Sequence, residues 1–160
     1  MSTIAEPTWL PYLHTRPTAR AVRSAPPPNE VSTETSMVAR EPNLFPLHEQ
    51  LNRIGLLRRN WDGYGSSRPD QTAIEKTHQL IETVYKPIAT LTGWQSPHVN
   101  ASEDGEIVLE WWHGTRKLTV YVGPHQTTYV KSWGPNVVNE MEDGPLPEDW
   151  VASLWLWLFG

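Results

Sequence analysis

The stretch E-I-V-L-E-W-W-H-G-T-R-K-L-T-V-Y-V, residues 106–122, decides the fold of this chain. Large apolar residues alternate with polar ones on both sides of H-G-T-R, residues 113–116. Such alternation is typical of β-strands with one buried face, and a short loop between two of them makes a hairpin. A four-residue loop places Trp112 opposite Lys117. The register then pairs residues that we expect in the core, namely Trp111 with Leu118, Leu109 with Val120, and Ile107 with Val122.

The same period of two continues on both sides of this hairpin. It predicts four strands, at residues 97–102, 106–112, 117–122 and 128–133, joined as an antiparallel meander. The link between the third and fourth strands, residues 123–127, contains Gly123 and Pro124 and is interpreted as a five-residue loop. A loop of that length places Thr128 and Val130 on the core face.

Helical periodicity precedes the predicted sheet. From Leu47 a first apolar stripe predicts a short helix, and Pro46 suits its first turn. Asp70 and its neighbours predict the start of a second helix, which Pro87 should kink or end. The apolar stripe of this helix is Ile74, Thr77, Ile81, Val84, Ile88 and Leu91. A short C-terminal helix is expected from about Pro147 through Leu158.

Residues 1–42 have a different composition, with seven prolines and many Ser and Thr residues. Proline disfavours helix in itself and in the residue before it, so the segment is interpreted as a Pro-rich arm that is disordered or becomes ordered on a partner. Residues 43–160 are interpreted as a single domain. The predicted fold class is α+β, a four-stranded antiparallel meander with helices packed on one face, preceded by this arm.

Alternation also predicts the residues on the opposite face of the sheet. Aromatic and cationic side chains there should form one contiguous patch, consisting of Trp112, Lys117, Tyr121, Tyr129, Lys131 and Trp133. A contiguous exposed aromatic patch usually marks an interaction surface, although the arm or the C-terminal segment could instead cover it. In the arm, T-W-L-P-Y-L contains the only large anchors, Trp9 and Tyr12. We therefore expect these eight residues to bind a protein partner or a second copy of the chain.

The sequence N-W-D-G-Y-G, residues 60–65, lies between the two predicted helices. Gly63 and Gly65 allow the positive φ angles of a tight turn, and Asp62 can accept hydrogen bonds from nearby backbone N–H groups or cap the second helix. Trp61 and Tyr64 can tuck under the sheet and hold the corner. We therefore interpret these residues as a structural turn.

This motif also carries a resemblance. N-W-D-G-Y-G, followed by a helix and by D-G-E-I-V-L-E-W at 104–111, resembles small uncharacterised bacterial proteins with a W-D-G-Y-G … D-G-x-x-x-x-E-W layout. The likeness covers about residues 47–122. It implies kinship and an association with accessory, phage and mobile-element genes. It implies no catalytic residue and no cofactor.

Composition excludes several classes of function. The chain has no cysteine, which excludes disulfides and thiolate chemistry, and its formal net charge of −5 argues against nucleic acid as a partner. The histidines lack the spacing of a metal site, so no metal and no cofactor is expected. No secretory signal or membrane-spanning run is visible, and a cytoplasmic location is expected.

The function predicted from these patterns is that of a non-enzymatic, protein-binding accessory factor. It would be an inhibitor, immunity protein or assembly component of bacterial or phage origin. Whether the chain is an enzyme stays open, since a small hydrolase could be built around Asp62, Glu110 and His113. A further alternative is a single-stranded nucleic-acid binder that stacks bases on the aromatic face.

Overall fold

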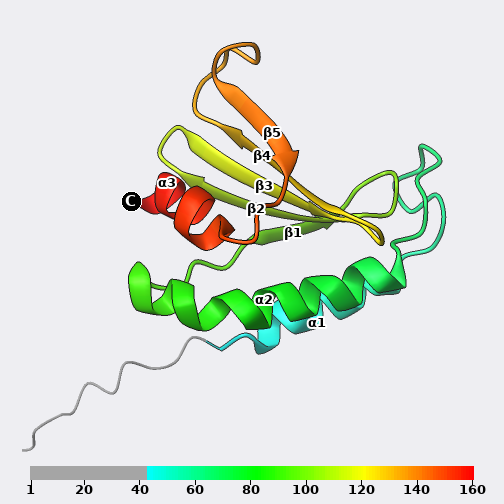
Figure 1. Ribbon diagram of the computed structural model, residues 1–160. Helices are drawn as coiled ribbons and strands as arrows, with labels where there is room; N and C mark the ends of the chain where they lie inside the picture. The colour runs from blue at the N-terminus through cyan, green and yellow to red at the C-terminus, as the bar shows by residue number, and fades with distance from the viewer. Residues whose placement is uncertain (1–42) are drawn as a thin grey trace, which may run out of the picture. The chain divides into compact units, whose positions relative to one another are not determined.

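The computed structural model describes residues 43–160, and Trp9 and Tyr12 lie outside this part of the chain. An antiparallel sheet carries its helices on one side (Figure 1). The helical elements are α1 (Phe45–Gly55), α2 (Gln71–Leu91), the π-helical turn η1 (Val151–Trp155) and α3 (Leu156–Phe159). The strands are β1 (His98–Ala101), β2 (Ile107–His113), β3 (Arg116–Val122), β4 (Thr127–Ser132) and β5 (Met141–Pro145). The α+β class is confirmed.

The sheet has five strands in the order β1-β2-β3-β4-β5, one more than predicted. The missed strand β5 reads M-E-D-G-P, which has no apolar alternation and contains both Gly and Pro. It is an edge strand, and contacts with β4 hold it in the sheet although its own sequence does not favour a strand. Tyr129 lies opposite Gly144, and Lys131 lies opposite Glu142. Pro145 at its end fits a sheet edge, where a missing N–H costs no ladder bond.

The predicted β2–β3 register is confirmed in every pair, including Trp112 opposite Lys117 and Trp111 opposite Leu118. His113 and Arg116 also pair, so only Gly114 and Thr115 turn the chain. Gly114 has φ 60°, a value that suits a tight two-residue hairpin turn.

Helices α1 and α2 form where the sequence predicts them, whereas the expected C-terminal helix begins only at Val151, with the π-helical turn η1. Helix α1 contains Pro46 in its first turn and buries Leu47 and Leu51. Helix α2 is capped by the Asp70 carboxylate, which accepts a hydrogen bond from the Ala73 N–H at 3.1 Å. Its predicted stripe is buried from Ile74 to Ile88, whereas Leu91 is exposed. Pro87 lies inside the helix and does not end it.

The core fills the space between the sheet and the helices. The inward residues of β2 and β3 meet the buried faces of α1 and α2 and the C-terminal turn, where Trp155 is fully buried. Trp111 packs against the rings of Trp150 and Trp155, with ring centroids 6.2 and 5.6 Å away, and its indole N–H donates to the Gln95 carbonyl. This core fixes which face of the sheet stays open.

The β3–β4 register differs from the prediction by one residue. Val122 pairs with Thr127, so the loop is four residues long, 123–126, and is closed by the Gly123 N–H donating to the Gln126 carbonyl. A one-residue shift exchanges the two faces of a strand. Tyr129 therefore lies opposite Val120 on the core face, and Val130 lies opposite Thr119 on the outer face.

Candidate functional site

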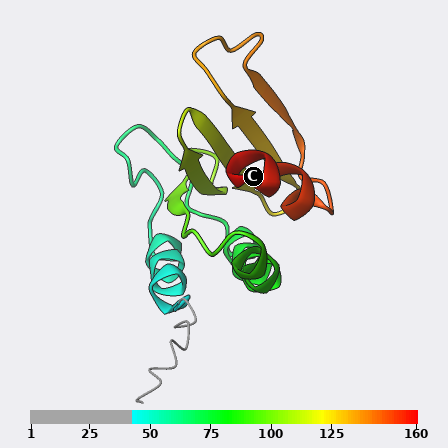
Figure 2. The same cartoon turned by 90° about the vertical axis from the view of Figure 1, so that its left-hand side faces the viewer.

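The outer face of the sheet is the side away from α1, α2 and α3 (Figure 1; Figure 2). We define it by the strand residues that share this side: His98, Asn100, Val108, Glu110, Trp112, Lys117, Thr119, Tyr121, Thr128, Val130, Ser132, Met141, Asp143 and Pro145. No described helix packs on this face. Three of the six predicted sheet-face residues lie on it, namely Trp112, Lys117 and Tyr121.

The other three predicted residues, Tyr129, Lys131 and Trp133, belong to the opposite face, so the single aromatic patch is corrected. The Tyr129 hydroxyl donates to the Glu142 carboxylate at 2.7 Å, and Lys131 forms an ion pair with the same carboxylate at 2.9 Å. Trp133 packs edge-on against Trp157, which precedes the chain end by three residues. These side chains join β4 to β5 and to the C-terminal helix.

The shared carboxylate changes the titration of its neighbours in opposite directions. The pKa of Glu142 is lowered, chiefly because Lys131 donates a hydrogen bond to the carboxylate, with Tyr129 as a second donor. The pKa of Tyr129 is raised, chiefly because its hydroxyl donates to Glu142. Both shifts favour a protonated Tyr129 and an ionised Glu142 at neutral pH, which is the combination that the hydrogen bond from Tyr129 to Glu142 requires.

A compact polar cluster lies on the outer face around Trp112. Glu110 forms an ion pair with Lys117 at 2.5 Å and approaches His98 at 3.5 Å. The Lys117 ammonium is also 5.1 Å from the centre of the Trp112 ring, within cation–π range. Lys131 takes no part in this cluster, because it lies on the opposite face of the sheet.

Trp112 is the large exposed side chain of this cluster, with 52% of its surface accessible. A shallow depression of about 360 Å³ lies beside it, lined by Glu110, His98 and the segment Gln95–Pro97 among others. Sequence reasoning placed Trp112 correctly but missed His98 as a neighbour. The β1–β2 pairing His98–Glu110 was the signal that could have found it.

The N-W-D-G-Y-G corner is held by its own hydrogen bonds. The Asp62 carboxylate accepts bonds from the Tyr64 N–H at 2.8 Å and from the Ser66 hydroxyl at 2.8 Å. The pKa of Asp62 is lowered, chiefly by the bond from the Tyr64 N–H. Gly63 and Gly65 have φ of 82° and 95°, as the turn interpretation requires. Asp62 does not cap α2, since Asp70 does.

The aromatic side chains of this corner do not tuck under the sheet. Tyr64 is 93% exposed and Trp61 is 38% exposed. The Trp61 indole N–H donates to the Ser67 carbonyl at 3.2 Å, so that ring lies along the surface of the loop. Hydrogen bonds within the loop, and not rings buried in the core, therefore hold the corner.

The three candidates for acid–base chemistry do not converge. Glu110 lies on the outer face, whereas His113 has the inward parity of β2 and its Nδ1 lies 3.0 Å from the Leu158 carbonyl. Asp62 is engaged in the corner loop. Within residues 43–160, no group of three or more histidine and carboxylate side chains could hold a metal ion. Nor does any helix in this part have the length and apolarity to cross a membrane.

Comparison of the chain with protein-family models, with curated proteins and with solved structures gives no match.

Proposed function

We propose that this chain is a non-enzymatic protein-binding accessory factor that binds its partner through the outer face of the sheet, centred on Trp112. The single observation that carries the proposal is the half-exposed Trp112 ring on a sheet face that no described helix covers. Tryptophan and tyrosine are enriched among the residues that dominate protein interfaces. Tyr121 and Val130 add apolar surface to the same face.

The charged residues around Trp112 fit such a role. Lys117 is held by Glu110 on one side and by the Trp112 ring on the other, so little side-chain freedom remains to be lost on binding. A rim of fixed charges beside an exposed ring favours a partner with matched charges over other surfaces. The role would be to occlude or bridge a partner, as an inhibitor, immunity protein or assembly component of bacterial or phage origin does, in the cytoplasm.

Two other functions have less support. A hydrolase needs its acid and base to converge, and Asp62, Glu110 and His113 lie in different places. Single-stranded nucleic-acid binding needs several stacking rings and a cationic groove. Tyr129, Lys131 and Trp133, which would have supplied part of both, lie on the opposite face.

The test places a photo-crosslinking amino acid at position 112 of the full-length chain in its native host. Leu91, which is 56% exposed at the end of α2 and away from the sheet face, supplies the matched control position. We expect a discrete protein adduct from position 112 that position 91 does not give. We also expect Tyr121→Ala to reduce the yield of this adduct while the domain stays folded, with a loss of about 1 kcal/mol or less. Equal adducts from both positions would contradict the proposal.

A further inference from the structure

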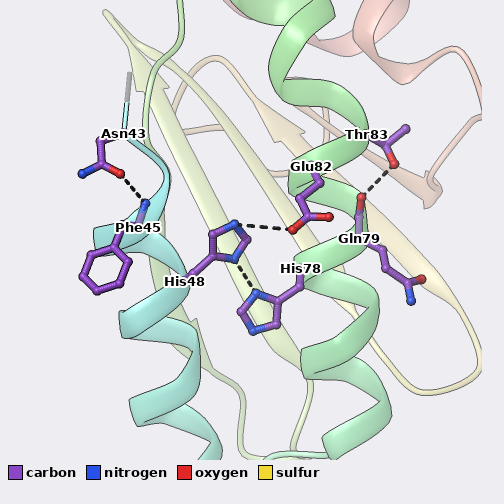
Figure 3. A network of polar contacts seen from close by, with 7 residues as sticks. All are labelled: Asn43, Phe45, His48, His78, Gln79, Glu82 and Thr83. Carbon is purple, nitrogen blue, oxygen red and sulfur yellow. Dashed lines mark hydrogen bonds and ion pairs between the residues drawn. The ribbon is translucent and has the colours of Figure 1, made fainter. Parts of the chain in front are cut away.

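Two histidines meet between the first two helices. His48 of α1 and His78 of α2 approach each other with their Nδ1 atoms 2.5 Å apart (Figure 3). The ring centroids are 4.7 Å apart and the ring planes are inclined by 18°, so the two rings meet edge to edge and nearly in one plane. Both side chains are partly buried, so this contact belongs to the α1–α2 packing.

The distance determines how many protons the pair can hold. Two imidazole nitrogens this close need one proton between them, because two lone pairs or two N–H groups would repel. Glu82, one turn after His78, lies with its carboxylate 3.8 Å from His48 Nε2 (Figure 3). We assign the Nε2 proton of His48 to face this carboxylate, so that the His78 Nδ1–H donates to His48 Nδ1.

A second proton on the pair would create two adjacent positive charges. Burial lowers the pKa of His78, and the charge of His48 lowers it further, while Glu82 acts in the opposite direction. Within residues 43–160, Glu82 is the one carboxylate at ion-pair distance from either ring. It is 67% exposed, and solvent weakens its compensation. Strand β1 also packs against α1. Its contact there is the Val99 carbonyl, which accepts a hydrogen bond from the Gln50 side chain, and neither group is charged.

We propose that the His48–His78 pair is a proton-sensitive latch, which holds α1 against α2 with one shared proton and releases α1 when both rings become charged. Release would expose the buried Leu47 and Leu51 and free the Val99 carbonyl of β1, to which Gln50 donates. Acidification would thereby uncover an apolar strip and a strand edge. This device is independent of the function proposed for the outer face.

The direction of the pH effect follows from the lowered pKa of His78. The unfolded chain, with an ordinary histidine pKa of 6.5, binds more protons than the folded chain as the pH falls. The stabilising contribution is therefore complete above the unfolded value. It is lost as the pH falls from 6.5 towards the lowered folded value.

The experiment measures thermal unfolding of the full-length chain between about pH 7.5 and about pH 5, across the histidine range. Wild type should lose about 4 °C more in midpoint over this range than His78→Gln or His48→Gln. His125→Gln, a change in an exposed loop, should behave as wild type. Glu82→Gln should increase the loss, because it removes the compensating carboxylate.

A second measurement keeps the result decisive if a variant folds poorly. Imidazole nitrogen NMR of wild type should show His78 titrating with a pKa below the ordinary histidine value. Amide exchange in α1, after correction for intrinsic rates, should accelerate over the same step. Titration of His78 at the ordinary histidine pKa of 6.5 would overturn the latch. A second result would also overturn it. If zinc alone stabilises wild type at neutral pH but does not stabilise His48→Gln, the pair is a metal site.

Discussion

Val120 lies directly opposite Tyr129 across β3 and β4, and this pairing turns Tyr129 into the core side of the sheet. Only 9% of Tyr129 is exposed, and its hydroxyl reaches the Glu142 carboxylate of the edge strand. A single pair thus assigns three predicted binding residues, Tyr129, Lys131 and Trp133, to holding β5 and the chain end. The outer face keeps Trp112 as its exposed ring.

Tyr129→Ala should destabilise the domain by about 3 kcal/mol, because it removes a buried ring. Tyr121→Ala, at the neighbouring position of β3 on the outer face, should cost about 1 kcal/mol or less. Urea unfolding of both variants gives the comparison. Equal losses would show that Tyr121 and Tyr129 share one face after all.

Substitutions of Trp111 and Trp112 test the β2–β3 register, which places the first ring in the core and the second on the outer face. Trp111→Ala should cost about 3–5 kcal/mol of unfolding free energy, since it removes a ring packed on Trp150 and Trp155. Trp112→Ala should change the unfolding free energy by about 1 kcal/mol or less, because the ring is half exposed. Denaturant titration monitored by far-UV circular dichroism avoids the fluorescence lost with each tryptophan. If Trp112→Ala destabilises the protein more than Trp111→Ala does, the core lies on the Trp112 side of β2 and the proposed outer face is wrong.

Gly105→Ala should be more damaging than Gly63→Ala. Both glycines have positive φ, which costs an alanine about 1 kcal/mol. A Cβ at Gly63 meets no atom within 4 Å, whereas at Gly105 it would lie 2.7 Å from the Arg68 carbonyl oxygen. The Asp70 N–H, which donates to the Gly105 carbonyl at the start of α2, would be displaced as well. Thermal melts of the two variants measure the difference, and equal melting midpoints would contradict this packing.

Asp62 should hold the corner loop in a pH-dependent way. Its folded pKa is lowered below 3.8, so its stabilising effect is present above that value and is lost as the pH falls through the folded pKa. Asp62→Ala should accelerate amide exchange at Tyr64 and Ser66 at neutral pH while leaving exchange in β2 and β3 unchanged. If exchange at Tyr64 is unaffected, the carboxylate does not order the loop.

The β2–β3 hairpin and the start and buried face of α2 could be predicted from the sequence alone. In residues 106–122, the alternation of large apolar residues and the short turn agree on one register, and a shift by one would bury charged residues. Asp70 and the apolar stripe likewise fix the start and the buried face of α2. The candidate Trp112 followed from the same register.

Only the tertiary structure decided the facing of β4, the existence of β5 and the meeting of His48 with His78. Both faces of β4 carry apolar groups, Tyr129 on one and Val130 on the other, so alternation does not distinguish them. The side of the sheet that Tyr129 and Lys131 occupy is decided by their contacts with Glu142 and Trp157, which lie far along the chain. The two histidines are 30 residues apart, and each lies on its helix without a local signal. Such pairings depend on how elements pack, which no local period records.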